Sequence, residues 1–248
     1  MFENFFGRLD SAFLSGGGYK LMVEGLFNTI LIAFCALIIG VILGTVFAVI
    51  NVTPGKGKVN WILKKIASVY ITVIRGTPVM VQLLLVYFGI APVIKAFQIS
   101  FSVALPFSSI KIKVTSALVW AILVFGINSS AYVAEIVRSG IQAVDKGQME
   151  AGRSLGLPYS ITMVKVVLPQ AIKNILPALG NELIVLIKET SVAGFITVFD
   201  LTRAARAVVA NTYDAFVPYF VLASIYLALV MIATYFVRRL ERRLGKSD

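Results

Sequence analysis

The sequence predicts an all-α integral membrane protein with five transmembrane helices, its N-terminus outside and its C-terminus in the cytoplasm. Composition favours this class, because 58% of the 248 residues are hydrophobic and only 14% are charged, against about a quarter in soluble domains. Length agrees, since each crossing needs about 20 apolar residues and the spans leave no room for a separate soluble domain. We therefore expect a single transmembrane domain over residues 1–248.

The formal charge of +11 could indicate a nucleic-acid surface, so the position of the basic residues matters more than their number. They lie in short segments that flank apolar runs, as cytoplasmic membrane flanks do. The chain has no His, and its single Cys35 lies in an apolar run, so neither a disulfide framework nor a Cys/His metal site is predicted. We expect no nucleic-acid partner and no metal.

The first two spans are predicted at residues 26–50 and 66–94. In the first, small residues recur at four-residue spacing and would let another helix approach closely, at Gly40, Gly44 and Ala48. The second contains Arg75-Gly76-Thr77-Pro78, where the proline removes a backbone donor and disfavours helix just before it. We expect the piece before the break to lie at the membrane interface or to form part of one long second span that is broken at this point.

Three further spans follow a mixed loop and are predicted at residues 114–137, 183–199 and 215–237. The loop covers residues 99–113, and the fourth span contains the charged pair Lys188 and Glu189. With the N-terminus outside, the inner segments hold about twice as many Lys and Arg residues as the outer ones. That excess favours the stated orientation.

A polar segment at residues 139–177 separates the third and fourth spans and is expected in the cytoplasm. Its first part favours a short helix that stops at Gly156-Leu157-Pro158. Leu168-Pro169 is expected to break the chain a second time. The prediction is therefore a helix, a sharp turn and a second helix that protrude from the membrane.

This segment also carries a family signature. Glu150-Ala151-Gly152, then Gly156 and later Leu168-Pro169, resembles the E-A-A loop of ABC importer permeases, the binding-protein-dependent transport system inner membrane components. Shorter stretches resemble the polar amino acid branch of that family, at residues 75–78, 128–132, 135–140, 168–171 and 188–191. Gly152 replaces the second Ala of the signature, a change expected to matter little for packing while lowering helix propensity.

The resemblance implies a type I ABC importer permease fold and the permease subunit of an ATP-driven importer of polar amino acids. In that family the loop helix docks on an ATPase subunit and transmits closure of the ATP-bound dimer. The coupling residues would be Glu150, Ala151, Gly152, Arg153, Ser154, Gly156 and Leu157. The implied partners are two ATP-binding subunits, a second permease subunit that is identical or a close paralogue, and an extracellular or periplasmic solute-binding protein. The implied location is a bacterial cytoplasmic (inner) membrane.

The chain contains no G-x-x-x-x-G-K-[ST] phosphate loop, and the run Gly55-Lys56-Gly57-Lys58 has the wrong spacing and is better explained as a basic turn. The energy source must then lie on another chain. We expect this chain to be a transport subunit and not an enzyme. It would bind no cofactor of its own, with ATP and Mg²⁺ held by the partner ATPase.

Polar residues within the predicted spans are candidates for a substrate path, because ionisable groups at membrane depth are costly and usually face a cavity or a partner. Helical spacing places Asn128, Tyr132 and Glu135 on one face of the third span, and Glu182 and Glu189 on one face of the fourth. The candidates are Arg75, Thr77, Gln82, Asn128, Tyr132, Glu135, Glu182, Glu189, Thr190 and Ser191. The carboxylates would make the path acidic and favour cationic amino acids. Alternatively, they pair with Lys188, Arg138 or Arg75 only to hold helices together.

The main alternative function is an ion- or proton-coupled secondary amino acid transporter, in which Glu135, Lys188 and Glu189 would relay protons or bind ions without ATP. The protruding loop argues against it. An intramembrane enzyme has few candidate groups for hydrolytic chemistry, and a structural membrane protein would not need buried charges.

Overall fold

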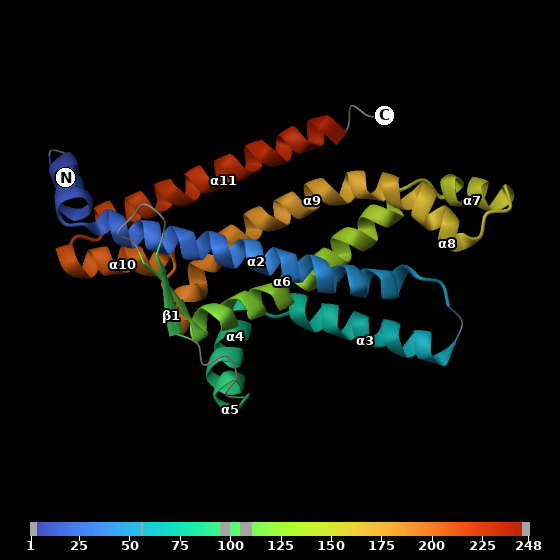
Figure 1. The fold of residues 1–248 in the computed structure, drawn as a ribbon, viewed down its shortest axis with the longest axis horizontal. Helices are drawn as coiled ribbons and strands as arrows, with labels where there is room; N and C mark the ends of the chain where they lie inside the picture. Colours follow the sequence, from blue (N-terminus) through green and yellow to red (C-terminus); the bar gives the residue numbers. More distant parts are fainter. Residues whose placement is uncertain (1–3, 56, 95–99, 105–110, 245–248) are drawn as a thin grey trace. The chain divides into compact units, whose positions relative to one another are not determined.

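The computed structural model describes residues 4–55, 57–94, 100–104 and 111–244, which are mostly helical (Figure 1). The long helices are Gly18–Val52 (α2), Lys58–Arg75 (α3), Ser116–Gln142 (α6), Leu168–Glu189 (α9) and Phe216–Leu244 (α11). The shorter ones are Phe5–Leu9 (α1), Val79–Leu84 (α4), Ala91–Ile94 (α5), Lys146–Ser154 (α7), Tyr159–Thr162 (α8) and Leu201–Thr212 (α10). π-Helical turns cover Asp10–Ser15, Leu85–Ile90 and Met163–Val167, and a 3₁₀ helix covers Thr190–Ile196.

The chain divides into two compact units, each assembled from three separate stretches. The first unit comprises Met1–Ala36, Pro78–Gly126 and Val185–Met231. The second unit comprises Leu37–Thr77, Ile127–Ile184 and Ile232–Asp248. Since the unit boundaries fall within α2, α6, α9 and α11, each of these helices contributes residues to both units.

Three described helices, α2, α6 and α11, are each long and apolar enough to cross a membrane. A fourth span is added if α3 and residues 79–94 form one broken span. The helical backbone is interrupted at the sequence that predicted a break, because α3 ends at Arg75 and α4 begins only after Pro78. Residues 183–199 do not form a helix of their own, since α9 starts at Leu168 and gives way to 3₁₀ geometry at Thr190. The number of five spans and the orientation stay predictions.

Pro169 lies inside a continuous helix and does not break the chain, so that expectation is wrong. The backbone is helical from Tyr159 through the π-helical turn at Met163–Val167 to Glu189. Proline lacks an N–H, and its ring crowds the carbonyl four residues earlier, here that of Lys165. The π-helical turn around Lys165 is wider than an α-helical turn and accommodates the ring.

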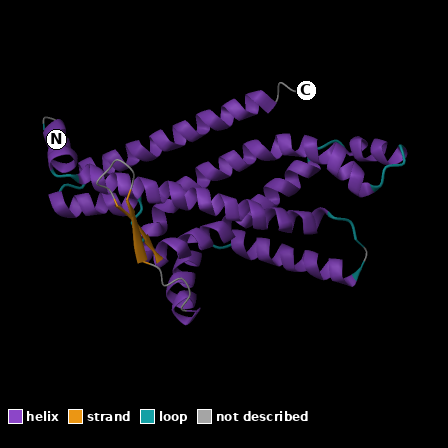
Figure 2. Cartoon of the chain, in the orientation of Figure 1, coloured by secondary structure: helices purple, strands orange, loops and turns teal. Residues whose placement is uncertain are grey.

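A short β-hairpin corrects the all-α expectation. Strands Ser100–Ala104 (β1) and Lys111–Thr115 (β2) are the orange arrows of Figure 2. They pair antiparallel, with Phe101 opposite Val114. We expected a mixed loop at residues 99–113 and a helical span from residue 114. Instead β2 continues to Thr115, where β-branched residues favour strand, and α6 begins at the next residue. Pro106 of that loop lies outside the described residues.

The core of the first unit forms around α10, in a region that the sequence had assigned to an outer connection. The Asp200 carboxylate caps this helix by accepting backbone N–H bonds from Thr202 at 3.2 Å and Arg203 at 3.0 Å. Its buried face packs with residues near the N-terminus and the start of α11, in a cluster of Ala12, Phe13, Met22, Leu201, Ala204, Ala205, Val208 and Val217. Helix α10 was missed because the spans were predicted from continuous apolar runs, whereas only one face of this helix is apolar.

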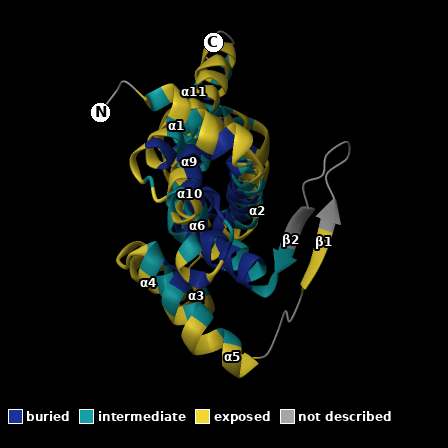
Figure 3. Cartoon of the chain, turned by 90° about the vertical axis from the view of Figure 1, so that its left-hand side faces the viewer, coloured by how far each residue is buried: buried dark blue, intermediate teal, exposed yellow. Residues whose placement is uncertain are grey.

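The core of the second unit contains the predicted small-residue stripe of α2, packed on α6. A Cβ atom on Gly40 would lie 2.7 Å from Ser129 Oγ, and one on Gly44 would lie 2.6 Å from the carbonyl oxygen of Ser130. Ala48 is fully buried. Many residues of α6 are buried, as Figure 3 shows. In contrast, α11 carries many exposed apolar residues. The stripe therefore acts as predicted, by letting two helix backbones approach closely.

Candidate functional site

The first candidate site is the segment of residues 145–167, which connects α6 to α9 and is called here the loop segment. Helix α7 ends in a Schellman motif, in which the N–H of Leu157 donates to the carbonyl of Gly152 at 3.2 Å and the N–H of Gly156 donates to that of Arg153 at 3.0 Å. Gly156 has a φ of +85°, a left-handed conformation that glycine adopts without steric cost. The sharp turn expected at this glycine is present.

Gly152 is a packing position between α7 and α8. It is buried, and a Cβ atom at this place would lie 2.4 Å from Thr162 Cγ2 and 3.3 Å from Thr162 Cβ. We expected the replacement of Ala by Gly to matter little for packing, and that expectation is wrong. An alanine here would collide with Thr162, so the glycine and the β-branched threonine are matched to each other.

The other predicted coupling residues lie at the surface of the loop segment. The exposed ones are Glu150, Ala151, Arg153, Ser154 and Gly156, while Leu157 is half-buried. Sequence reasoning missed Leu155, which is 83% exposed at the turn. Leu155 could have been found from the sequence, because it is an apolar residue that directly follows the polar residues Arg153 and Ser154. The loop segment thus presents an apolar side chain within a polar rim, as protein interfaces do.

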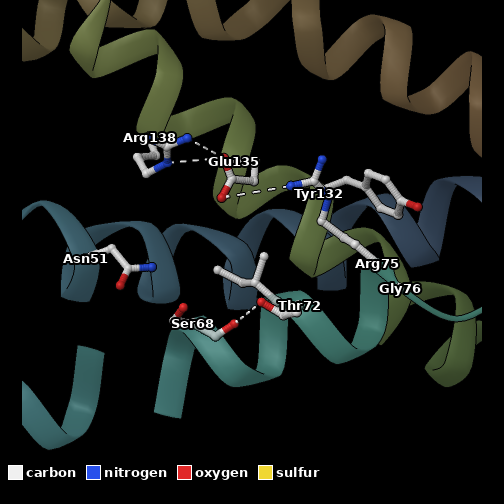
Figure 4. Close-up of a pocket in the computed structure, with 9 residues that line it drawn as sticks. Asn51, Ser68, Thr72, Arg75, Gly76, Tyr132, Glu135 and Arg138 are labelled. Carbon is white, nitrogen blue, oxygen red and sulfur yellow. Dashed lines mark hydrogen bonds and ion pairs between the residues drawn. The ribbon is translucent and has the colours of Figure 1, made fainter. Parts of the chain in front are cut away.

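The second candidate site is a cavity of about 660 Å³ in the second unit, called here the arginine pocket (Figure 4). Its lining comes from α2, α3 and α6 and consists of Asn51, Ser68, Ile71, Thr72, Arg75, Gly76, Tyr132, Glu135 and Arg138. Of the residues proposed for a substrate path, it brings together Arg75, Tyr132 and Glu135. Asn51, Ser68 and Thr72 were missed, because isolated Asn, Ser and Thr residues carry no signal in a sequence.

Three charged side chains dominate the arginine pocket. Glu135 Oε2 accepts hydrogen bonds from Arg138 Nη2 at 2.6 Å and Nε at 3.1 Å, and Glu135 Oε1 lies 3.9 Å from Arg75 Nη1. The Arg75 guanidinium also lies over the Tyr132 ring, 5.3 Å from its centre. Glu135 therefore has both arginine partners that were considered for it from the sequence.

The remaining path candidates of the second unit lie outside the pocket lining. Thr77 is exposed, and its hydroxyl donates to the carbonyl of Val73 at 3.0 Å. Asn128 is buried, although helical spacing put it on the face of Tyr132 and Glu135. Glu182 is buried and accepts a hydrogen bond from the Ser129 hydroxyl at 2.7 Å.

The path candidates of the first unit are Gln82, Glu189, Thr190 and Ser191. Thr190 is buried and donates to the carbonyl of Ile187 at 2.7 Å, while Gln82 and Ser191 are half-buried. Glu189 is half-buried at the end of α9 and makes no hydrogen bond or ion pair with any described residue. Within the part of the chain that the structure describes, no group of three His, Cys, Asp or Glu side chains could hold a metal ion.

Comparison with known proteins identifies the family. Residues 40–246 match the family described as "Binding-protein-dependent transport system inner membrane component". The chain belongs to this family. A relative named "Arginine transport system permease protein ArtQ" from Bacillus subtilis (strain 168) is 39% identical over 227 residues, covering 92% of this chain and 94% of the relative. The "Glutamine transport system permease protein GlnP" of Escherichia coli (strain K12) is 34% identical over 224 residues, covering 90% and 93%.

Solved structures agree with this family. An amino acid ABC transporter crystallised with histidines is similar with a TM-score of 0.78 and 42% identity, covering 93% of this chain and 98% of the other. An inward-facing MetNI methionine ABC transporter has a TM-score of 0.71 at 21% identity, covering 90% and 96%, and supports the fold alone. The family predicted from the loop signature is confirmed.

In this permease the loop segment follows the end of α6 that lines the arginine pocket, and both lie within the second unit. A Cβ atom on Gly140 would lie 2.4 Å from Ile175 Cγ1, so α6 and α9 are in close contact where the loop segment begins. Arg138, which lines the pocket, lies two residues before Gly140 on α6. At 1.5 Å per residue, Glu135 is only about 8 Å along the helix from this contact.

Proposed function

We propose that this permease is the membrane subunit of an ATP-driven importer of polar amino acids in a bacterial cytoplasmic (inner) membrane, with its N-terminus outside. The observation that carries the proposal is the exposed loop segment with the E-A-A signature, in a chain without a phosphate loop. The relatives named for arginine and glutamine transport support amino acids as the substrate class.

The proposed assembly contains two ATP-binding subunits, a second permease subunit that is identical or a close paralogue, and an external solute-binding protein. ATP and Mg²⁺ would bind to the ATP-binding subunits, because no segment of this chain has the spacing of a phosphate loop. This arrangement is what membership of the family implies.

The docking surface for the ATP-binding subunit is the exposed side of α7 and its turn. Glu150 and Arg153 supply a polar rim, and Leu155 supplies an apolar centre. A cavity of about 450 Å³ beside α7, lined in part by Val144 and Met149, adds apolar surface. Full burial of a leucine side chain contributes about 2 kcal/mol, so Leu155 would add to the docking energy on that scale.

Movement of the loop segment would reach the arginine pocket through two helices. The helical backbone from Tyr159 into α9 is continuous, and α6 and α9 touch at Gly140 and Ile175. A displacement of α6 would carry Tyr132 and Glu135 relative to α3. Closure of the ATP-bound dimer could in this way open and close access to the pocket.

The proposed substrate path contains the arginine pocket together with the polar residues Thr77, Gln82, Asn128, Glu182, Glu189, Thr190 and Ser191. A preference for cationic amino acids would rest on Glu189, because Glu135 and Glu182 already have partners in the chain. A half-buried carboxylate that makes no ion pair is costly in a membrane. A cationic substrate group would remove that cost.

The test is uptake into vesicles that contain the permease with its ATP-binding subunits and the solute-binding protein. We expect amino acid uptake that requires ATP inside the compartment holding the ATP-binding subunits. The purified permease alone should hydrolyse no ATP. Uptake by the permease alone, driven by a proton or sodium gradient, would instead establish a secondary transporter.

A further inference from the structure

We propose that the arginine pocket binds the carboxylate group of the transported amino acid through Arg75. The inference rests on the proposed function, since it takes an amino acid as the cargo, and it names the group that this site recognises. The site would select for a carboxylate and would be indifferent to a cationic side chain. It differs in this from the expectation of an acidic path.

The Arg75 guanidinium has hydrogen-bonding capacity that the chain leaves unused. It makes no hydrogen bond with any described residue, and its 3.9 Å separation from Glu135 Oε1 exceeds hydrogen-bond length. Its side chain is 43% exposed. Arg138 differs, because its Nε and Nη2 donate to Glu135 and its Nη1 donates to Gln142 Oε1 at 2.7 Å. Arg138 is therefore fixed within the protein, whereas Arg75 is available to a ligand.

The charge of the pocket favours an anion. Two guanidinium groups and a single carboxylate line it, which leaves an excess of one positive charge, and the other lining residues are uncharged. The Asn51 amide and the Ser68 hydroxyl add polar groups that make no side-chain hydrogen bond with described residues. Both groups can donate hydrogen bonds to an anionic ligand that enters the pocket.

The geometry of Arg75 suits a carboxylate in particular. Figure 4 shows its guanidinium between the Tyr132 ring and the Glu135 carboxylate. A contact with the face of the ring uses none of the N–H donors, so the guanidinium keeps them for a bidentate contact with a carboxylate. Glu135 acts as a positioning residue that holds the guanidinium electrostatically without using its donors. The volume of about 660 Å³ is within the usual range of small-molecule sites.

The consequence concerns specificity. Every α-amino acid has the same carboxylate, so Arg75 would anchor the cargo without choosing among side chains. Discrimination among side chains would then fall to other groups, with Glu189 the candidate in the first unit. Amines that lack the carboxylate would be excluded from the pocket even when their cationic end matches a substrate.

The test is equilibrium binding to the purified complex of the permease with its ATP-binding subunits, without the solute-binding protein, which has a specificity of its own. The probes are radiolabelled arginine, lysine, histidine and glutamine. The competitors are the matched amines that lack the carboxylate, namely agmatine, cadaverine, histamine and 4-aminobutanamide. We compare wild type with Arg75→Gln, Arg75→Lys and the control Lys65→Gln, which removes an exposed charge from the same helix outside the pocket.

We expect the wild type to bind at least one of the amino acids and to bind the matched amine far more weakly. Arg75→Gln should weaken amino acid binding by about 10- to 100-fold, the scale of losing hydrogen bonds between charged groups. Arg75→Lys keeps the charge without the planar fork and should lose less, and Lys65→Gln should bind as the wild type does. Co-purification of the ATP-binding subunits reports whether each variant assembles.

Two results would overturn the inference while leaving the proposed function intact. One is that the assembled Arg75→Gln and Arg75→Lys complexes both bind the amino acid with wild-type affinity. The other is that the amine binds wild type as tightly as its amino acid does. A complex that binds and imports none of the amino acids would contradict the proposed function itself.

Discussion

The loop segment and the arginine pocket are held in shape by different means. The loop segment is fixed by its own backbone, through a Schellman motif and one left-handed glycine, all within consecutive residues. The arginine pocket is held by side chains from three helices that are distant in the sequence. A short motif therefore reports on the first site, while the second exists only after folding. The two sites should also respond differently to mutation.

Gly156→Leu should have the largest effect and act on coupling. A residue with a side chain costs about 1–2 kcal/mol in the left-handed region, so the turn would be rebuilt and the docking surface displaced. We expect transport-linked ATPase activity to fall at least tenfold while the chain still inserts. Gly57→Leu is the matched control, because a Cβ atom at either glycine meets no atom within 4 Å, but Gly57 has a φ of −83°. Full transport by the Gly156→Leu complex would contradict the coupling role.

Gly152→Ala should have the next largest effect, although it restores the residue that the family signature carries. The added methyl collides with Thr162, and overpacking typically costs about 1–3 kcal/mol. We expect a several-fold loss of coupled ATPase activity and a lower unfolding temperature.

The pair Gly152→Ala and Thr162→Ser forms a double-mutant cycle for this contact. Thr162→Ser removes the Cγ2 atom, which lies 2.4 Å from the place that the alanine methyl would take, and should have little effect alone. The double mutant should recover most of the activity that Gly152→Ala loses, since the effects of substitutions at contacting residues are not additive. Additive losses in the double mutant would show that the two residues do not constrain each other.

Features that depend on neighbouring residues could be predicted from the sequence, whereas features that depend on residues distant in the sequence could not. The signature, the turn at Gly156 and the break before Pro78 depend on local backbone chemistry, so they could be read directly. The collision at Gly152 could not, because Thr162 comes close only when α8 folds back on α7. The break expected at Pro169 was wrong because the sequence does not reveal the π-helical turn that accommodates the proline ring. The partners of Glu135 were only candidates until α3 and α6 were placed together.

Glu189→Gln tests whether charge selection lies outside the arginine pocket. Glu189 makes no hydrogen bond or ion pair with the described residues, so its loss should remove attraction for a cationic substrate group and little else. We expect affinity for arginine or lysine to fall by about fivefold, near the 1 kcal/mol scale of a partly solvated ion pair, with glutamine affinity unchanged. Glu241→Gln, at an exposed carboxylate of α11, is the control. Equal changes for cationic and neutral amino acids would indicate a structural role.

Asp214→Asn should have the smallest effect, and it separates a purely structural arginine from Arg75. Arg8 donates through Nε to Asp214 Oδ2 at 2.7 Å and through Nη2 to Oδ1, so its guanidinium edge is occupied within the first unit. The hydrogen bonds from Arg8 lower the pKa of the Asp214 carboxyl below its usual range. A group with a depressed pKa stabilises the folded state above its unfolded value of about 3.9 and loses this contribution as pH falls through the folded value.

The wild type and Asp214→Asn should therefore differ in unfolding temperature at neutral pH and converge below about pH 4. The difference should be worth less than about 1 kcal/mol, because Arg8 is partly exposed and such pairs are screened. Thermal unfolding of the detergent-solubilised complex across pH measures it, alongside amino acid binding, which should be unchanged. A loss of binding in Asp214→Asn that matched the loss in Arg75→Gln would show that removing any arginine contact disturbs the site, and would remove the distinction drawn for Arg75.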